Sequence, residues 1–326
     1  MNIIMKKKIV LKNKKIVLTG GSGFIGSHLL ESLLEDNQLC VIDNEYRGSN
    51  IESVKKSYPK LAKNILVQKC DIRNNTELTK IFKKFKPDVV FHLAGIAGVS
   101  TVYNHPMSVI DVNLLGSYNL GKAVLECGTV EKLVYSSTSE VYGPSAYQLN
   151  EDSFTTQGNA YDRRWAYSTS KLFAEHVFVA LEREYDLNVS IGRLFNIYGP
   201  KQIGDGAIHF FIKNAISNKP LTIYDDGAQI RAWCYVKDCI QGLRLISEKG
   251  QGIYNIGNPY EALTTTGLAK LVIDLLESHS KLIHKKLGFS DIKVRVPNIE
   301  KISKIGFKPK IDLRDGILKT AEWFKK

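Results

Sequence analysis

The chain carries three glycines, Gly20, Gly23 and Gly26, spaced three positions apart, and this triplet constrains its fold more than any other feature. An apolar run at 16–18 precedes the triplet and predicts a buried strand, and an apolar pattern of helical spacing begins at Ile25. Glycine is needed where a backbone turns sharply, approaches a pyrophosphate without a Cβ, and packs a helix against a strand. The helix N-terminus then offers unsatisfied N–H groups to the phosphates. The pattern predicts a dinucleotide-binding turn, with an ordinary tight turn as the alternative.

The residue that follows the second apolar run predicts which dinucleotide is bound. This run, at 39–42, ends in Asp43, about 20 residues after the glycines, as the dinucleotide pattern requires. A carboxylate here accepts hydrogen bonds from a ribose diol and repels a 2′-phosphate, so NAD is favoured over NADP. Arg47 lies close by and leaves NADP open, and a strand-end turn is the alternative role for Asp43.

Short apolar runs alternate with helical patterns through the first two thirds of the chain. We expect strands at 16–18, 39–42, 65–67, 89–93, 133–136 and 189–194, and helices at 78–85, 109–127 and 167–185. This alternation predicts an α/β fold, a Rossmann-type doubly wound parallel sheet with helices on both faces. From about residue 199 the elements become shorter. We therefore expect an NAD-binding domain at 1–198 and a smaller α/β substrate-binding lobe at 199–326, with some exchange of segments.

Composition narrows the class of protein and its partners. A hydrophobic fraction of 44% with 24% charged residues is ordinary for a globular chain. Five scattered cysteines argue against a disulfide framework and against a zinc site, so we expect no metal and a cytoplasmic location. The net charge of +12 is spread along the chain without a basic-aromatic module, so we expect no nucleic-acid partner. No apolar stretch predicts a membrane span. A basic surface suits an anionic small substrate.

Tyr167 and Lys171 lie four positions apart at the start of a helical pattern, which places both side chains on one helical face. A free phenol titrates near pH ~10 and is a poor base at neutrality. We expect the lysine cation, together with a positive nicotinamide, to lower the pKa of Tyr167. The alternative is an ordinary helix surface.

A second candidate motif, residues 136–143, follows the predicted strand at 133–136. It places several hydroxyls and one carboxylate at the carboxyl edge of the sheet, with Thr138, Ser139 and Glu140 adjacent. A hydroxyl at this edge could hold a substrate oxygen while Tyr167 removes its proton. A Ser/Thr-rich turn that caps a helix is the alternative.

Taken together, these motifs resemble the extended short-chain dehydrogenase/reductase family, specifically its NAD-dependent nucleotide-sugar epimerases, dehydratases and decarboxylases. The resemblance covers nearly the whole chain. Besides the glycine triplet and the two candidate motifs, it rests on Asp71-Ile72, on 92–95, on Asn113, on 193–200, on 227–238, on 254–258 and on 295–298.

The resemblance implies a role for each matched residue. The cofactor would be bound by Gly20, Gly23, Phe24, Ile25, Gly26, Asp43, Asn44, Asp71, Ile72, Leu93, Ala94 and Gly95, with Tyr167 and Lys171. The substrate would be bound by Ser100, Asn196, Tyr224, Arg231 and Arg295, the asparagine and the two arginines holding its diphosphate. Catalysis would fall to Tyr167, Lys171, Thr138, Glu140 and Ser139. Surface positions remain the alternative for the two arginines.

The resemblance also implies transient oxidation at C4 of the sugar, followed by one of three reactions. Thr138-Ser139-Glu140 is similar to the motif of UDP-glucuronate decarboxylases, which use NAD, and the 164–167 segment is similar to that of some decarboxylases. A 4,6-dehydratase of the dTDP type carries an aspartate in place of Ser139. A 4-epimerase usually carries a small or apolar residue in place of Glu140. A decarboxylase-like enzyme is therefore the expectation, and 4,6-dehydratase and 4-epimerase remain alternatives.

Two segments argue against the assignment as a decarboxylase. The loop at 97–100 is more similar to that of hexuronate 4-epimerases, and the segment at 295–297 lacks the lysine of typical decarboxylases. A catalytically idle NAD-binding scaffold is a more distant alternative. A UDP-sugar is the favoured substrate, and a homodimer through the helices at 109–127 and 167–185 is the expected assembly.

Overall fold

The computed structural model describes residues 8–204, 206–286 and 292–325, and its largest element is a parallel sheet of seven strands. These strands are β1 (Lys15–Thr19), β2 (Gln38–Asp43), β3 (Ile65–Lys69), β4 (Val89–His92), β5 (Lys132–Thr138), β7 (Val189–Leu194) and β12 (Gly252–Ile256). Their order across the sheet is β12-β7-β5-β4-β1-β2-β3. Strand order reverses between β1 and β4, and open parallel sheets bind ligands at such a switch point.

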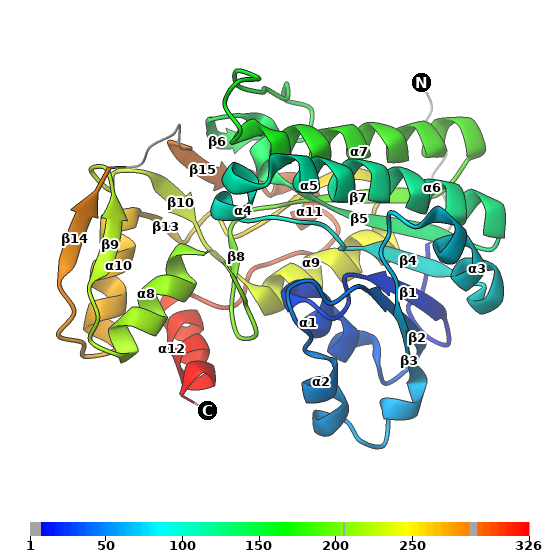
Figure 1. Cartoon of the computed structure of the whole chain (residues 1–326), viewed down its shortest axis with the longest axis horizontal. Coiled ribbons are helices and arrows are strands. Elements are labelled where there is room, and N and C mark those ends of the chain that lie inside the picture. Colours follow the sequence, from blue (N-terminus) through cyan, green and yellow to red (C-terminus); the bar gives the residue numbers. More distant parts are fainter. Residues whose placement is uncertain (1–7, 205, 287–291, 326) are drawn as a thin grey trace.

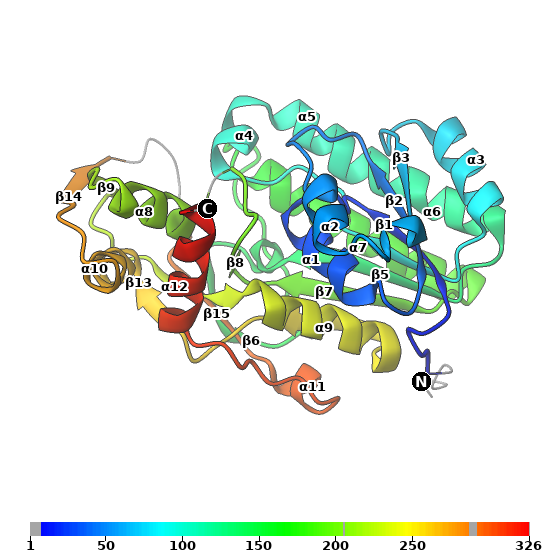
Figure 2. The same cartoon turned by 90° about the horizontal axis from the view of Figure 1, so that it is seen from below.

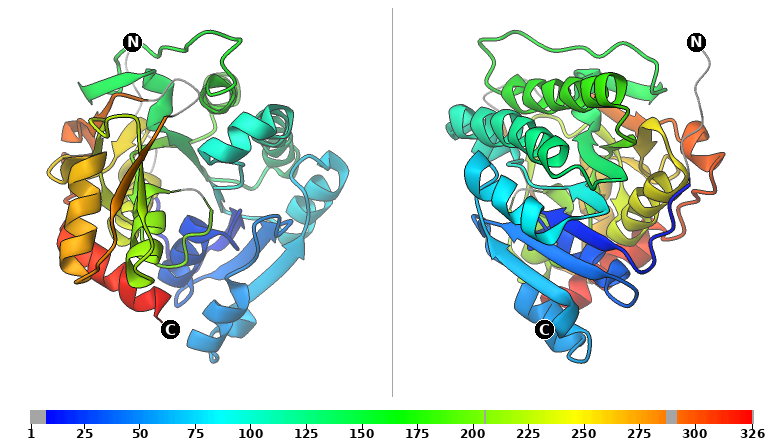
Figure 3. Two further views of the ribbon diagram at one scale, coloured as in Figure 1. Left: turned by 60° about the vertical axis from the view of Figure 1, so that its left-hand side comes forward. Right: turned by 90° about the vertical axis from the view of Figure 1, so that its right-hand side faces the viewer.

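Helices cover both faces of this sheet, because neighbouring residues of each strand point to opposite sides. Ile16 and Leu18 of β1 join the core on one face, and Val17 joins the core on the other. The first face is covered by α1 (Phe24–Leu33), α2 (Ile51–Ser57) and α9 (Val236–Lys249). The second face is covered by α3 (Asn75–Phe85), α6 (Gly116–Cys127) and α7 (Trp165–Tyr185). Figures 1 and 3 show these two helical layers, and the predicted α/β, Rossmann-type fold class is confirmed.

The helix expected at 109–127 is not uniform, and this part of the prediction is corrected. The structure has α5 (Pro106–Ile110), a π-helical turn (Asp111–Leu115) and then α6. A Cβ on Gly116 would lie 2.3 Å from Cδ1 of Ile72, so the chain comes too close to the loop after β3 to carry a side chain there. Wide turns of this kind accumulate at functional sites. Asn113 lies within the turn, and its amide hydrogen-bonds both backbone groups of Ile96.

A second lobe is built from short strands and four helices. Its four-stranded sheet contains β6 (Ser145–Leu149), β10 (Ile230–Ala232), β13 (Ala262–Thr264) and β15 (Val294–Pro297), in the order β13-β10-β15-β6. Two strand pairs accompany it, β8 (Ile197–Tyr198) with β11 (Cys234–Tyr235), and β9 (Leu221–Tyr224) with β14 (Leu282–Lys285). The helices are α8 (Ala207–Ile216), α10 (Thr265–Leu275), α11 (Glu300–Ser303) and α12 (Leu313–Phe324). The remaining short elements are α4 (Val99–Asn104) and the 3-10 turns Ala62–Asn64 and Ser139–Tyr142.

The two lobes exchange strands across the predicted boundary between 198 and 199. Strand β12 forms the edge of the seven-stranded sheet beside β7, and α9 packs beneath that sheet next to α1 (Figure 2). In the other direction, β6 pairs with β15 in the four-stranded sheet. The chain therefore passes between the lobes several times, and the residues between β5 and α7 lie where the two lobes meet.

Candidate active site

Two glycines of the turn between β1 and α1 leave no room for a side chain. Gly20 has a φ of +70°, and a Cβ on it would lie 2.6 Å from the backbone nitrogen of Ala94. A Cβ on Gly26 would lie 2.1 Å from the carbonyl oxygen of Gly20. Gly23 is the N-cap of α1, and no side chain caps the helix there. The first amides of α1 thus remain available to a phosphate group.

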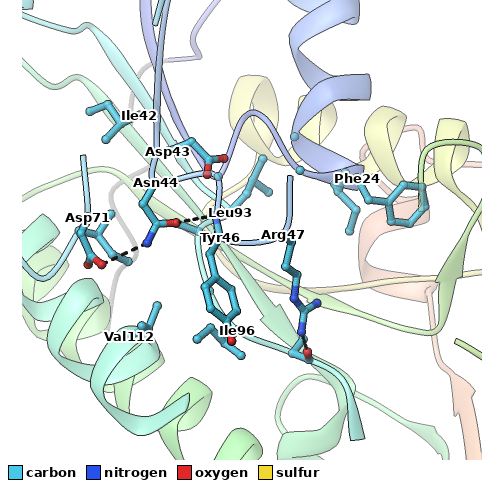
Figure 4. A pocket seen from close by; sticks show the side chains of 18 of the residues that line it. Phe24, Ile42, Asp43, Asn44, Tyr46, Arg47, Asp71, Leu93, Ile96 and Val112 are labelled. Carbon is cyan, nitrogen blue, oxygen red and sulfur yellow. Dashed lines mark hydrogen bonds between the residues drawn. The ribbon is translucent and has the colours of Figure 1, made fainter. Parts of the chain in front are cut away.

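This turn forms one wall of a cleft of about 400 Å³ at the carboxyl ends of β1, β2 and β4 (Figure 4). The structure brings together here twelve of the residues expected to bind the cofactor: Gly20, Gly23, Phe24, Ile25, Gly26, Asp43, Asn44, Asp71, Ile72, Leu93, Ala94 and Gly95. The residues present fit NAD, because bare backbone faces the place of the pyrophosphate and carboxylates stand at the place of the ribose and adenine.

Asp43 and Arg47 point to different parts of this cleft. The Asp43 carboxylate, at the end of β2, accepts the backbone N–H groups of Ser22 and Glu45 at 3.0 and 2.8 Å. Burial raises the pKa of this carboxyl. Arg47 instead donates to the carbonyl of Ala97, beyond β4, as Figure 4 shows. With its guanidinium engaged there, Arg47 does not balance Asp43 where a 2′-phosphate would sit, which favours NAD.

Asp71 is fixed by two neighbours at the edge of the cleft. Arg73 donates to both of its oxygens, at 3.0 and 2.8 Å, and the amide of Asn44 donates at 3.1 Å. The hydrogen bonds from Arg73 lower the pKa of Asp71 to about 2, so the carboxylate stays ionised. Asp71 and Asn44 come from neighbouring strands, and their contact shapes the end of the cleft opposite the helix N-terminus.

Tyr46, Arg47, Gln202 and Ile203 are among the lining residues that were not predicted as cofactor-binding from the sequence. The first two lie three and four residues after Asp43, so their position after a cofactor-binding strand was an available signal. The last two come from the loop after β8, in the part of the chain assigned to the other lobe. No local pattern marks them, because tertiary packing alone brings that loop over the cleft.

The second part of the site is the turn at the end of β5. Thr138 ends the strand, and its hydroxyl accepts the backbone N–H of Glu140 at 3.2 Å. The same hydroxyl lowers the pKa of Tyr167 and so acts on its phenol. Thr138 is also the cap of the Ser139–Tyr142 turn, the alternative role expected for this motif.

The expectation that Lys171 lowers the pKa of Tyr167 needs correction. Burial raises the pKa of Tyr167 well above its ordinary value, and the Glu140 carboxylate raises it further. The groups that oppose these effects are the Thr138 hydroxyl and two arginines, Arg164 and Arg47. The helix places Lys171 on the same side as Tyr167, but its ammonium group turns to the sheet.

Lys171 is anchored to the end of β5. Its Nζ donates to the carbonyl of Ser136 at 2.6 Å and lies 4.6 Å from the ring centre of Tyr135. Only 5% of the residue is exposed, and burial lowers the pKa of Lys171 to about 7. The Glu175 carboxylate, one helical turn further along α7, acts in the opposite direction.

Glu140 is paired with an arginine that the sequence did not mark as a site residue. The distance from Arg164 Nη1 to Glu140 Oε2 is 2.7 Å, and Arg164 Nη2 donates to Oε1 at 3.0 Å. Arg164 is 5% exposed and lies three residues before Tyr167, so both face the same turn. That spacing was the signal available in the sequence.

The residues expected to bind the substrate are not gathered into one cluster. Ser100 is exposed on α4, Tyr224 is 47% exposed on β9, and the amide of Asn196 donates to the carbonyl of Ala232 at 3.0 Å. Arg231 and Arg295 sit side by side, because β10 and β15 pair with these two residues in register.

Arg295 reaches the catalytic turn from the second lobe. It is 1% exposed, and its guanidinium donates to the carbonyls of Ser139 and Gly143 at 2.5 and 2.8 Å. Its bonds to these two carbonyls hold the segment that carries Ser139 and Glu140. The structure therefore places Arg295 against the backbone of the catalytic turn.

The described part of the chain contains neither a membrane-spanning helix nor a metal-binding cluster. Within residues 8–204, 206–286 and 292–325, no helix has the length and apolar character needed to cross a bilayer. Over the same residues, no group of three or more histidine, cysteine or acidic side chains is arranged to hold a metal ion.

Comparison with known sequences places this site among related proteins. Residues 16–257 match the model of the NAD dependent epimerase/dehydratase family. The chain is 32% identical over 325 residues to a UDP-N-acetyl-alpha-D-glucosaminuronate decarboxylase of Bacillus cytotoxicus, covering 96% of this chain and 98% of the relative. It is also 32% identical to a dTDP-D-glucose 4,6-dehydratase of Mus musculus, covering 96% of this chain and 89% of the relative.

Comparison with solved structures gives a consistent picture. The fold is similar to that of the UDP-glucuronic acid 4-epimerase of Bacillus cereus, solved with UDP-glucuronic acid and NAD. The TM-score is 0.85 at 28% identity, and the match covers 95% of this chain and 99% of the epimerase. Three different reactions are thus represented among proteins that share this architecture.

Proposed function

The chain belongs to the NAD-dependent epimerase/dehydratase family, the extended short-chain dehydrogenase/reductase enzymes, and on this premise we propose that it acts on a nucleotide sugar. The proposed reaction begins with transient oxidation at C4 of the sugar. A UDP-hexuronate is the favoured substrate, and its decarboxylation, as in UDP-glucuronate decarboxylases, is the favoured outcome. The enzyme would then be a lyase, whereas the 4-epimerase alternative would make it an isomerase.

The cofactor is NAD, as the family requires. When bound, NAD accepts a hydride from the sugar carbon and returns it later. The glycine turn would hold its pyrophosphate, Asp43 its adenosine ribose, and Asp71 with Ile72 its adenine end. Leu93 to Gly95 would line the path toward Tyr167 and Lys171.

The catalytic roles follow from the contacts around Tyr167. Its phenol would take the proton of the C4 hydroxyl, and Thr138, which acts on that phenol, would orient the same substrate oxygen. Lys171 supplies a positive charge on the same helical face and would bind the nicotinamide ribose. These assignments are the core of the proposal.

The observation that favours decarboxylation is the Arg164–Glu140 pair beside Ser139. A 4,6-dehydratase must remove a proton from C5 and protonate the departing C6 hydroxyl. Serine is a poor proton donor, and Glu140 is already paired with Arg164, which donates to Oε1 at 3.0 Å and lies 2.7 Å from Oε2. A 4-keto hexuronate is a β-keto acid and loses carbon dioxide without a strong acid. The family relatives at similar identity include both a decarboxylase and a dehydratase, so the geometry of this pair decides our preference.

We further propose that Asn196, Arg231 and Arg295 serve the diphosphate, with Arg295 acting from its position against the catalytic turn. Ser100 and Tyr224 would contact the sugar and the nucleotide when the substrate brings the two lobes together. The chain is proposed to be cytoplasmic, with a basic surface that attracts anionic substrates.

A homodimer is the proposed assembly. Leu115, Tyr118 and Phe173 are 42%, 47% and 41% exposed on the layer formed by α6, α7 and the turn before α6. Large apolar side chains on one helical layer are typical of an interface between copies. Light scattering on the purified protein measures the mass, and a monomer at every concentration would contradict the proposal.

The reaction is tested by incubating purified protein and NAD with a panel of UDP-, dTDP- and GDP-sugars, including hexuronates. Release of carbon dioxide with a pentose nucleotide product supports the proposal. A stable 4-keto-6-deoxy product identifies a dehydratase, and a C4 epimer identifies an epimerase. Turnover of none of the sugars would favour the idle scaffold.

The variant Glu140→Gln distinguishes decarboxylation and dehydration from 4-epimerisation. Glutamine cannot form an ion pair with Arg164, so an unbalanced positive charge is left beside C5 of the sugar. We expect decarboxylation or dehydration to fall at least about tenfold, while a 4-epimerase would be spared. Substitution of the exposed Asp152→Asn is the control for loss of a carboxylate elsewhere in the same region, and it should leave turnover unchanged.

A further inference from the structure

A buried ion pair lies directly beneath the catalytic turn. Glu175 of α7 and Arg193 of β7 are each 3% exposed. Arg193 Nη2 donates to Glu175 Oε2 at 2.7 Å, and its Nε contacts both carboxylate oxygens at 3.1 and 3.3 Å. Burying two opposite charges is weak evidence for a gain in stability, so the pair calls for another explanation.

The pair is bonded to both ends of the turn that carries Ser139 and Glu140. At its start, the hydroxyl of Ser137 donates to Glu175 Oε1 at 2.5 Å. At its end, Arg193 Nη1 donates to the phenol oxygen of Tyr142 at 2.9 Å, and the guanidinium lies 4.8 Å from the centre of the Tyr142 ring. Both attachments are side-chain bonds to one rigid pair, so the pair sets where the turn sits above the sheet.

The same carboxylate lies one helical turn from Lys171. Successive residues of β5 are bonded to successive turns of α7: Ser136 through its carbonyl to Lys171, and Ser137 through its hydroxyl to Glu175. Burial drives Lys171 toward its neutral form, and the Glu175 charge opposes this. The carboxylate is therefore placed to act on both the position and the charge of the catalytic groups.

The other groups that face Lys171 provide no comparable negative charge. Tyr167 lies on the same helix, and burial keeps its phenol protonated. Tyr135 of β5 presents its ring to the ammonium group, and burial likewise raises the pKa of its phenol. His92 of β4 is kept neutral, because burial lowers its pKa to about 3. Arg193 of β7 is positive and is balanced by Glu175.

We infer that Glu175 is a positioning residue of the active site, which fixes the Thr138–Glu140 turn through Ser137 and Arg193 and whose charge favours the ammonium form of Lys171 one helical turn away. The inference rests on the proposed function in one respect, namely that Lys171 and this turn carry the reaction. It adds a group that touches neither substrate nor cofactor.

Glu175→Gln tests the electrostatic half of the inference. Glutamine keeps the shape and can still accept from Ser137, but it removes the negative charge and leaves Arg193 unbalanced. Protein labelled with [ε-13C]lysine reports the titration of Lys171 by NMR, with Lys171→Met assigning the signal. In the parent protein we expect the Lys171 signal to titrate near neutrality, because burial lowers its pKa to about 7. We expect Glu175→Gln to move its midpoint down by about one pH unit or more.

Two further variants separate charge from position. Glu184→Gln removes an exposed carboxylate from the same helix and should leave the titration and the turnover unchanged. Ser137→Ala removes the bond to the turn but keeps the charge. We expect it to lower kcat about tenfold or more with little change in KM and no shift of the lysine titration. If Glu175→Gln does not fold, Glu175→Asp and Ser137→Ala replace it. In Glu175→Asp we expect the midpoint of the Lys171 titration to stay unchanged and kcat to fall.

A purely structural ion pair predicts a different set of results. Glu175→Gln would then lower the melting temperature while the lysine midpoint stayed in place, and Ser137→Ala would leave kcat unchanged; either result overturns the inference. The NMR titration needs no substrate. If the parent protein turns over no nucleotide sugar, the proposed function fails, and the titration still decides whether Glu175 sets the charge of Lys171.

Discussion

The Tyr167 side chain is partly buried in the fold, and the Glu140 carboxylate nearby adds a like charge to any phenolate that forms. Both effects keep the phenol protonated. Thr138, Arg164 and Arg47 act in the opposite direction. The charge at this position is therefore set by four groups, which come from β5, the following turn, the start of α7 and the segment after β2. The proton-transfer role of Tyr167 therefore depends on the whole local arrangement.

Tyr167→Phe removes the one oxygen placed to take the substrate proton. We expect turnover to fall by about 10²–10⁴-fold, because this is the usual size of a positioned acid–base contribution. NAD binding, measured by calorimetry, should be retained, since Tyr167 is not among the residues that line the cleft. Thr169→Val, two residues away on the exposed face, is the control. Retained activity would remove Tyr167 from the mechanism.

His92 makes the stability of the fold depend on pH. Its ring nitrogens hydrogen-bond Thr19 and Ser117 at 2.7 and 2.9 Å, and burial lowers its pKa to about 3. The unfolded chain takes up a proton at this residue below pH ~6.5 and the folded chain does not. The contribution of His92 to the free energy of unfolding is therefore fully present above that pH. It is lost as the pH drops toward 3, by up to about 1.4 kcal/mol per pH unit.

His92→Gln tests this dependence by urea unfolding at several pH values between 7 and 4. Glutamine can bond the same two hydroxyls and does not titrate, so the loss of stability on acidification should be shallower by about 1 kcal/mol per pH unit. The exposed His279→Gln serves as the matched control and should follow the parent protein. An unchanged slope in His92→Gln would show that other groups carry the acid sensitivity.

At the scale of elements, the β1–α1 turn was predicted in detail because each of its requirements is local. A sharp turn, a close approach and a helix start all act within seven residues, and glycine alone meets them. The π-helical turn before α6 was missed for the opposite reason. Its surroundings are set by tertiary packing, such as the approach of Gly116 to Ile72, which joins segments more than 40 residues apart.

Gly26→Ala tests the turn. The added Cβ would lie 2.1 Å from the carbonyl oxygen of Gly20, so the turn must open and the helix amides must move away from the phosphates. We expect NAD affinity, followed by calorimetry, to weaken about tenfold or more. Gly128→Ala, at the end of α6 with open space around its Cβ position, should cost about 1 kcal/mol of stability and leave NAD binding intact. Equal affinity in both variants would contradict the assignment of the turn.

At the scale of the whole molecule, the strand exchange couples the two lobes. The predicted domain at 1–198 lacks β12, which pairs with β7 along five residues, and it lacks α9, which supplies much of the core beneath the sheet. Removing both leaves an open strand edge and an uncovered apolar face. Cooperative folding should therefore require residues from both ranges.

A fragment of residues 1–198 should show no cooperative thermal transition and no NAD binding, whereas the full chain shows both. Circular dichroism during heating and calorimetry with NAD measure these properties. A further fragment extended to residue 257, which includes α9 and β12, should recover part of the transition. A stable NAD-binding 1–198 fragment would show that the exchange is dispensable.

The amino-acid sequence alone determined the fold class, the NAD preference and the Tyr167–Lys171 pair, because each depends on the order of residues within one strand, turn or helix. Only the tertiary structure decided that Arg164 holds Glu140, that Arg295 supports the catalytic turn, and that the Glu175–Arg193 pair lies beneath it. These contacts join residues between 18 and 156 positions apart. Sequence spacing says nothing about such pairs, since burial and charge at those positions exist only after the sheets and helices have packed.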